Sequence, residues 1–85
     1  MKTVEIYTTP YCPYCIAAKR LLDKKGVTYA ETDVSRDPAL RQAMTSRANG
    51  SRTVPQIFIG ETHVGGCDDL HALDGRGGLV PLLES

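Results

Sequence analysis

Short apolar segments with two different spacings alternate along the chain. In TVEIY, residues 3–7, apolar and polar side chains alternate, as they do in a half-buried strand. In the run that starts at Pro13, apolar residues recur at the three- and four-residue spacing of a helix. These patterns predict four strands, at 3–7, 27–34, 55–60 and 62–64. With the caps and turns between the strands, they also predict a helix from Pro13 to a stop at Gly26, a helix between Asp37-Pro38 and Asn49-Gly50, and a helix capped by Asp68. Residues 78–84 are predicted to form a short helix or turn.

The order of these elements, β-α-β-α-β-β-α, predicts an α/β fold. The apolar run Ile57–Ile59 is typical of a central strand that is buried on both faces. Gly60-Glu61 suits a two-residue hairpin, which makes the last two strands antiparallel. The first β-α-β unit should instead be a right-handed crossover between parallel strands. The sequence therefore predicts a four-stranded mixed sheet with helices on both faces, in a single domain over residues 1–85.

Composition and charge argue against two classes of partner, nucleic acids and membranes. The chain is 41% hydrophobic and 24% charged, with ten basic and ten acidic residues and no block of like charge, so neither nucleic acid nor a membrane is an expected partner. No apolar run approaches the roughly 18 residues of a membrane span, and the N-terminal segment lacks the apolar region of a secretory signal. Three cysteines are too few for a disulfide scaffold. We therefore expect a cytoplasmic protein, in which stable structural disulfides are rare.

Cys12 and Cys15 are two residues apart, at the junction between the first strand and the first helix. With Pro13 at the first helical position, Cys12 is expected at the N-cap, where unpaired N–H groups and the positive end of the helix dipole stabilise a thiolate and lower the thiol pKa. Cys15 lies within the first turn, near enough to attack a mixed disulfide formed on Cys12. The pair is suited to a dithiol–disulfide cycle, with Cys12 as the nucleophile and Cys15 as the resolving thiol.

Two other uses of the cysteines are open to the sequence. A structural zinc site needs four ligands, usually from two close-spaced pairs, and here Cys67 with His63 or His71 would have to complete it. A pair of buried, unreactive cysteines is the second alternative. A C-x-x-C motif between a strand and a helix of a β-α-β unit is typical of thioredoxin-like redox proteins. We therefore expect redox chemistry and no metal.

Three motifs together resemble the glutaredoxins, in particular their small bacterial dithiol type: CPYC at 12–15, TVPQIFI at 53–59 and GGCDDL at 65–70. The resemblance covers essentially the whole chain. It implies the thioredoxin fold and a glutathione-dependent thiol–disulfide oxidoreductase, with glutathione as the reducing co-substrate and no tightly bound cofactor. It also implies a monomer acting on glutathionylated or disulfide-containing proteins, with ribonucleotide reductase among the candidate substrates.

The resemblance further implies where glutathione binds. The Val54–Pro55 bond is expected to be cis, and Val54, with Thr53 before it, would offer its backbone to the cysteinyl part of glutathione as an added strand. Without the resemblance, Pro55 could simply begin a strand. Tyr14 would line the groove, although its spacing also suits packing in the core.

The segment around Gly66 is expected to hold the other end of glutathione. Gly65 and Gly66 would allow a close approach to the backbone, and the amides of Cys67 and Asp68 at a helix N-terminus would bind the γ-glutamyl carboxylate. The Asp68 side chain would bind the ammonium group. The alternative is a turn followed by an ordinary N-cap, with Asp69 favouring the helix dipole.

One position departs from the family pattern. Many glutaredoxins have a lysine a few residues before the first cysteine, where this chain has Thr9. Arg41 and Arg52 are the candidates for replacing its contact with the glycyl carboxylate. Cys67 is expected to be a small packed residue, with a regulatory, oxidisable thiol as the alternative.

The remaining tyrosines and the two histidines are expected to have no role in the chemistry. Tyr7, Tyr11 and Tyr29 are expected to pack, and His63 and His71 to lie on the surface.

Two rival functions remain open. The first is a glutaredoxin-like protein reduced by thioredoxin reductase, against which the 65–68 motif argues. The second is a dimeric carrier of an iron–sulfur cluster that is ligated by Cys12 and glutathione. Pro13 argues against the carrier, because cluster-binding relatives usually have a smaller residue there.

Overall fold

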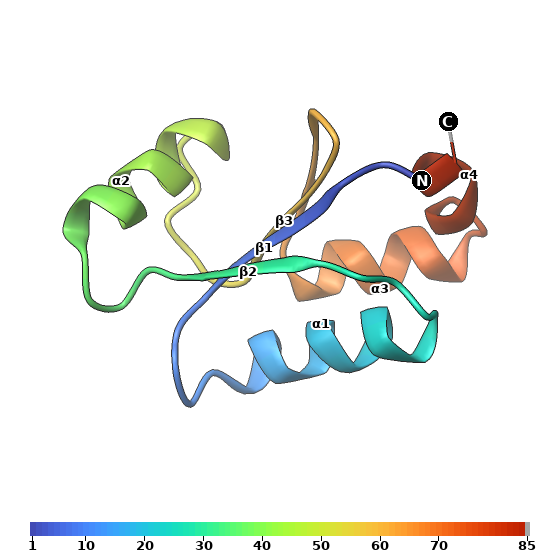
Figure 1. The fold of residues 1–85 in the computed structure, drawn as a ribbon, viewed down its shortest axis with the longest axis horizontal. Coiled ribbons are helices and arrows are strands. Elements are labelled where there is room, and N and C mark those ends of the chain that lie inside the picture. The colour runs from blue at the N-terminus through green and yellow to red at the C-terminus, as the bar shows by residue number, and fades with distance from the viewer. Residues whose placement is uncertain (85) are drawn as a thin grey trace.

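The computed structural model describes residues 1–84, within which lie four strands and four helices (Figure 1). In chain order they are β1 (Val4–Thr8), α1 (Pro13–Lys24), β2 (Ala30–Asp33), α2 (Pro38–Arg47), β3 (Gln56–Ile59), β4 (Thr62–Gly65), α3 (Cys67–Gly75) and α4 (Leu79–Glu84). The predicted β-α-β-α-β-β-α order is confirmed. The segment expected to be a short helix or turn forms α4.

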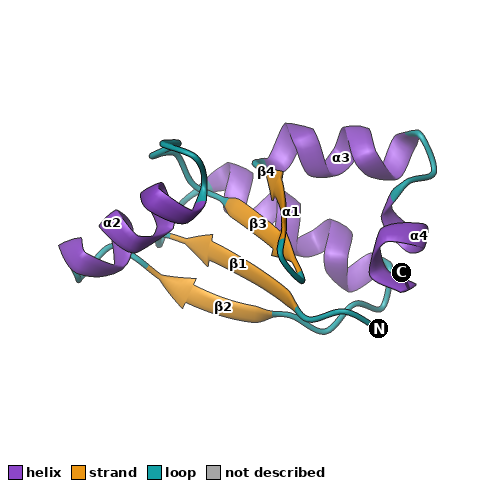
Figure 2. Cartoon of the chain, turned by 90° about the horizontal axis from the view of Figure 1, so that it is seen from above, coloured by secondary structure: helices purple, strands orange, loops and turns teal. Residues whose placement is uncertain are grey.

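The strands form one mixed sheet in the order β2-β1-β3-β4 (Figure 2). β1 and β2 are parallel, whereas β3 is antiparallel to both β1 and β4. All residues of β3 are buried, as predicted for a central strand, and the two residues Gly60-Glu61 connect it to β4. The carboxyl ends of β1 and β2 and the start of β3 therefore meet at one end of the sheet, where the chain enters α1.

Helices cover both faces of the sheet, as predicted. α1 and α3 pack against each other on one side, while α2 lies on the other side (Figure 1). The larger core lies on the side of α1, α3 and α4, and its buried members are Val4, Ile6, Ala18, Leu21, Leu22, Val27, Ile57, Ile59, Cys67, Leu70, Leu79 and Leu83. The residue between the two isoleucines, Phe58, faces the opposite side, because successive strand residues point to opposite faces. The sheet therefore holds α1 and α3, whose N-termini carry two of the three motifs, side by side.

The second strand is shorter than predicted, because residues 27–29 belong to the connection that follows α1. Gly26 has a φ of +70°, and the next amide, that of Val27, donates to the Leu22 carbonyl at 2.9 Å. This hydrogen bond gives a partner to one of the unpaired carbonyl groups at the end of α1. It also occupies the Val27 N–H, so the pairing of β2 with β1 begins only at Ala30. Val27 keeps its apolar role, since it is buried in the core.

The start of α3 also differs from the prediction. Gly66, and not Asp68, is the N-cap residue, and its N–H donates to the Asp69 carboxylate at 3.0 Å. Asp69 therefore takes the capping role through its side chain, from the third helical position. α2 begins as predicted, with the Asp37 carboxylate accepting the Ala39 N–H at 2.9 Å and Pro38 at the first helical position.

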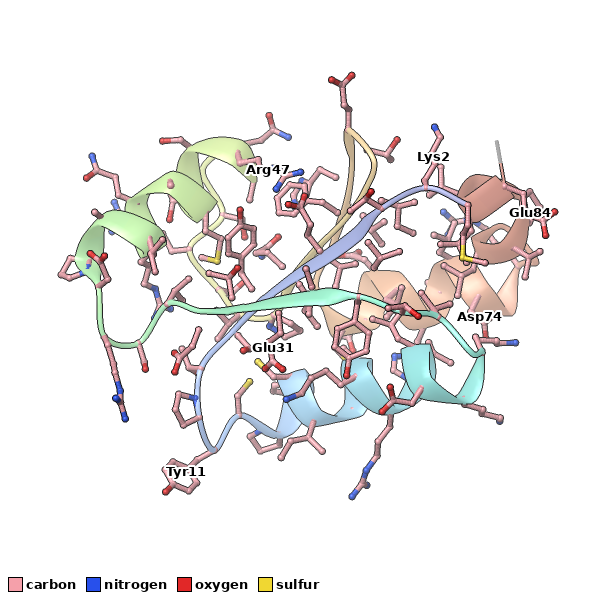
Figure 3. The ribbon with its side chains drawn as sticks, viewed as in Figure 1. Lys2, Tyr11, Glu31, Arg47, Asp74 and Glu84 are labelled. Atoms are coloured by element: carbon pink, nitrogen blue, oxygen red, sulfur yellow. The ribbon has the colours of Figure 1, made fainter. Side chains whose placement is uncertain are left out.

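Two predictions about aromatic side chains are wrong. Tyr11 does not pack: it is 98% exposed, with a φ of +60°, and Figure 3 shows it pointing away from the molecule. His63 is not a simple surface residue, because its ring stacks on Phe58 with 4.9 Å between centroids. Tyr7 and Tyr29 do pack, Tyr7 edge-on against Phe58 and Tyr29 against the core.

The two ends of the described chain lie side by side next to α4 (Figure 1), where the Lys2 N–H donates to the Leu83 carbonyl at 2.8 Å. Within residues 1–84, no helix has the length and apolar character required to cross a membrane.

Candidate active site

Cys12 is the N-cap residue of α1, as predicted. Its backbone is extended, Pro13 occupies the first helical turn, and its sulfur accepts the Cys15 N–H at 3.1 Å. A negative charge on this sulfur would be stabilised by that hydrogen bond and by the positive end of the helix dipole. The Cys12 thiol also lies 3.9 Å from the Val54 carbonyl. Cys12 is only partly buried, so that a substrate sulfur can reach it.

Cys15 differs from Cys12 in its surroundings, although both are free thiols. It is 1% exposed, and burial, followed by its hydrogen bond to Cys12, raises the pKa of the Cys15 thiol to about 12. Burial also raises the pKa of Cys67, with smaller contributions from the charges of Asp68 and Cys12. Burial therefore disfavours the thiolate of both Cys15 and Cys67, whereas Cys12 is the thiol that a substrate can reach.

The segment before β3 presents unpaired backbone groups beside Cys12. The Val54–Pro55 peptide bond is cis, as expected. Among residues 1–84, the Val54 N–H has no hydrogen-bond partner, and its carbonyl faces only the Cys12 thiol. An extended ligand could pair with these groups as an added strand.

The backbone at residue 65 passes close to the Asp69 side chain of α3, and glycine is required there. Gly65 has a φ of +115°, and a Cβ at this residue would lie only 2.3 Å from the Asp69 carboxylate. Asp69 is committed to the cap of α3, whereas the exposed Asp68 carboxylate makes no hydrogen bond or ion pair within residues 1–84. The first turn of α3 thus offers free amides and one free carboxylate, which suits a ligand that carries both charges.

These segments line one groove of about 390 Å³. Every residue predicted to contact glutathione lies in its wall, namely Tyr14, Thr53, Val54, Pro55, Gly66, Cys67 and Asp68. Tyr14 is 64% exposed, so it belongs to the groove and not to the core. Cys12 lies beside this groove, because its thiol faces the carbonyl of one wall residue, Val54, whereas Cys15 is buried.

Gly65, expected beside Gly66, also lies in the wall, together with four residues that were not predicted to be there: Ser51, Gln56, His63 and Asp69. One signal was available for Gln56, which is a polar residue in the buried strand QIFI. Nothing comparable in the sequence marks His63, since its position follows from the pairing of β4 with β3.

Arg41 and Arg52 do not line this groove. They line a separate hollow of about 530 Å³ beside α2, where Arg41 donates to the Arg52 carbonyl at 2.9 Å. Ser51 and Thr53 face the groove while Arg52, between them, lines the other hollow. A contact of either arginine with the glycyl carboxylate of glutathione therefore stays a prediction.

The zinc alternative finds no geometric support in the described part of the chain. Within residues 1–84, no three His, Cys, Asp or Glu side chains come together in a group that could hold a metal ion. Cys67 contacts His71, with 3.4 Å between Sγ and Nδ1, but the same nitrogen lies 2.9 Å from the Cys67 carbonyl.

Comparisons with known proteins agree with this architecture. The glutaredoxin family model matches residues 4–64. A curated relative, glutaredoxin 3 of Escherichia coli (strain K12), is 56% identical over 84 residues, which cover 99% of this chain and 100% of the relative. The solution structure of glutaredoxin from Brucella melitensis matches with a TM-score of 0.86 at 55% identity, over 98% of this chain and 89% of that one.

A fourth match includes a ligand in its description. The crystal structure of a buckwheat glutaredoxin–glutathione complex matches with a TM-score of 0.88 at 34% identity, over 98% of this chain and 77% of that one. Matches of this identity over nearly the whole length establish more than a shared fold. The chain belongs to the glutaredoxin family, with the thioredoxin fold and the redox-active cysteine pair Cys12 and Cys15 of a thiol–disulfide oxidoreductase.

Proposed function

We propose that the protein reduces glutathione mixed disulfides and protein disulfides, with glutathione as the electron donor. The observation that carries this proposal is the position of Cys12. Its sulfur accepts the Cys15 N–H at the start of α1 and faces a groove whose walls offer an unpaired strand edge and a helix N-terminus. The chain needs no tightly bound cofactor for this reaction, because the electrons are carried by the thiols themselves.

The reaction with a glutathionylated protein uses Cys12 alone. The Cys12 thiolate attacks the glutathione sulfur, the protein thiol leaves, and a Cys12–glutathione disulfide forms. A second glutathione, as its thiolate, then attacks the glutathione sulfur bound to Cys12. Glutathione disulfide is released and Cys12 returns as the thiolate, so each cycle consumes one free glutathione and converts one mixed disulfide into a protein thiol and one glutathione disulfide.

The reaction with a protein disulfide uses both thiols. Cys12 attacks one sulfur of the substrate, and the Cys15 thiolate then attacks the Cys12 sulfur, which releases the reduced protein and closes a Cys12–Cys15 disulfide. Two of the causes that raise the pKa of Cys15 come from the Cys12 side chain. Both are removed once the Cys12 sulfur is part of a mixed disulfide, so Cys15 becomes easier to deprotonate at the step where it must attack.

Glutathione would lie along the groove in one direction. Its cysteinyl backbone would pair with the backbone of Val54, which places the glutathione sulfur beside Cys12. Its γ-glutamyl carboxylate would accept hydrogen bonds from the free backbone amides of Cys67 and Asp68. The Asp68 carboxylate would bind the ammonium group. The glutathione complex of the buckwheat protein supports this ligand class.

Thiol–disulfide exchange driven by glutathione also indicates a compartment and a class of partner. We place the protein in the cytoplasm, where free thiols are kept reduced, and we propose that it acts as a monomer. Its substrates would be glutathionylated and disulfide-containing proteins, with ribonucleotide reductase among the candidates.

The test is reduction of a glutathione mixed disulfide, coupled to glutathione reductase and NADPH, with the native protein beside Cys12→Ser and Cys15→Ser. We expect Cys12→Ser to lose activity by a factor of at least about 10³, because the nucleophile is removed. Cys15→Ser should retain activity in this assay and lose it with a protein disulfide, since only the second reaction needs a resolving thiol.

An inactive native protein would exclude glutathione as the donor, and thioredoxin reductase would then replace glutathione reductase in the same assay. Visible absorbance from a glutathione-ligated cluster in protein purified without oxygen, together with an inactive dithiol, would favour the cluster carrier instead.

A further inference from the structure

Gln56 is the only polar residue of β3, and it is 2% exposed. Its carboxamide is fully engaged. Nε2 lies 2.9 Å from the Ser51 hydroxyl, 3.0 Å from the Thr53 carbonyl and 3.1 Å from the Thr53 hydroxyl. Oε1 lies 2.6 Å from His63 Nε2. Because three oxygen atoms surround Nε2 of Gln56 as acceptors, Oε1 of Gln56 is the atom that faces His63. An amide oxygen can only accept, so His63 donates this hydrogen bond from Nε2.

The histidine that orients this amide is itself held in place. The His63 ring stacks on Phe58 with an interplanar angle of 26°, and the Arg47 guanidinium lies 4.1 Å from the centroid of the same Phe58 ring. Arg47, labelled in Figure 3, also forms a salt bridge with Glu5 on β1. The orientation of Gln56 therefore depends on packing on the α2 side of the sheet, away from the thiols.

The segment that Gln56 holds has few other attachments. Residues 52–54 belong to no helix or strand, and within residues 1–84 no backbone–backbone hydrogen bond in the loops involves them. Thr53 is attached through Gln56 and through a 3.3 Å contact between its hydroxyl and that of Ser51, and the carbonyl of Arg52 accepts from Arg41. Gln56 is thus the main connection between this wall of the groove and the sheet.

We propose that Gln56 is a positioning residue: its buried carboxamide, oriented by His63, fixes residues 51–53 so that Val54 presents its free backbone groups to the substrate. Gln56 acts through Thr53 and not on the reacting sulfur atoms, so its effect belongs to substrate binding and not to the chemical step. The proposal rests on the proposed function, because the substrate that lies along Val54 is the glutathione part of the mixed disulfide.

The test compares Gln56→Met with Ile57→Val in the coupled glutathione assay. Methionine keeps the length of the side chain and removes both amide donors. Ile57→Val is the matched control, since it alters the neighbouring residue of β3 on the other face of the sheet and leaves the groove untouched. For Gln56→Met we expect KM for the mixed disulfide to rise about three- to tenfold with kcat nearly unchanged, because uniform binding is lost.

A second readout separates positioning from a general structural effect. The rate at which iodoacetamide alkylates Cys12 needs no groove, so it should be the same in Gln56→Met, Ile57→Val and the native protein. An unchanged KM would overturn the proposal. A lower kcat with altered alkylation would also overturn it, because Gln56 would then act on the thiol and not on the groove.

Backbone ¹⁵N relaxation at residues 52–54 tests the same role without any substrate, because within the described chain these amides have no backbone hydrogen bond whose loss hydrogen exchange could report. Lower order parameters there in Gln56→Met, but not in Ile57→Val, support the proposal, and unchanged order parameters overturn it, even if the native protein proves inactive with glutathione and the proposed function fails. Should Gln56→Met not fold, His63→Phe takes its place: it keeps a ring over Phe58, removes the donor to Gln56, and is expected to lower the order parameters of the same segment.

Discussion

The two thiols of the C-x-x-C motif differ strongly in accessibility, although one helical turn separates them. Cys12 is at the exposed start of α1, whereas the chain buries Cys15 beneath it. With reduced native protein at pH 7.5, we therefore expect a small excess of iodoacetamide to modify one thiol, Cys12, because only a thiolate that can be reached reacts. Mass spectrometry of the intact protein and of its peptides would measure the number and the position of the labels.

The control for this labelling experiment is the unfolded chain, in which all three cysteines should react. In the native protein the label should stay on Cys12 when the pH is raised to about 8.5, because Cys15 is buried and its pKa is raised to about 12. Early labelling of Cys15 at pH 7.5 would contradict the burial seen in the structure.

At the scale of elements, one ion-pair cluster connects β1, β2 and α1. Glu31 reaches from β2 toward α1 (Figure 3), where it accepts from the Thr8 hydroxyl at 2.7 Å and from Lys19 at 3.0 Å. The Thr8 hydrogen bond, followed by that of Lys19, lowers the pKa of Glu31. A carboxyl group whose pKa is lower in the folded state stabilises the fold above its unfolded pKa of about 4.3, and this contribution is lost as the pH falls through the folded value.

We therefore expect Glu31→Gln to lower the free energy of unfolding by about 0.5 kcal/mol at pH 7, a modest value because the side chains are partly exposed. The difference from the native protein should be smaller at about pH 3, because the contribution of the carboxylate is progressively lost below its unfolded pKa of about 4.3. Urea unfolding at both pH values measures it. The matched control is Glu61→Gln in the β3–β4 turn, an exposed carboxylate with no ion pair within residues 1–84, which should change stability at neither pH. A difference that grows at low pH would contradict the assignment.

At the scale of the whole molecule, stability depends on one small core. The radius of gyration is 12.0 Å, as expected for a compact chain of this length. A domain of this size has a free energy of unfolding of roughly 5–10 kcal/mol, so a single buried side chain contributes a large share of it. Leu22, on the inner face of α1, is fully buried in this core.

We expect Leu22→Ala to cost about 2–5 kcal/mol, through lost burial and the cavity it leaves. Ile16→Ala on the same helix is the matched control, because Ile16 is 43% exposed and its truncation should cost less than about 1 kcal/mol. Urea midpoints of the two variants, measured beside the native protein, test this difference. Equal losses would show that the inner face of α1 is not where the fold gains its stability.

Much of the fold could be predicted because its signals are local. The alternation in β1, the Asp37-Pro38 start of α2 and the Gly60-Glu61 turn each depend on neighbouring residues, and each is confirmed. The prediction failed at the start of α3, where two local signals compete for the cap. Asp68 has the chemistry of an N-cap, but Gly66 takes that position, because Gly65 turns the chain at the end of β4 and Asp69 reaches back to the Gly66 amide.

The sequence alone determined the order of the elements and the place of Cys12 at the start of a helix. These follow from periodicity and capping, which are properties of neighbouring residues, whereas the residues expected to contact glutathione came from the resemblance to the glutaredoxins. Only the tertiary structure decided that Tyr11 is exposed while Tyr14 lines the groove, that Arg52 lines a separate hollow, and that Gln56 connects the groove to His63. The physical reason is that side-chain surroundings depend on which strands and helices pack together, and residues far apart in the sequence set that packing.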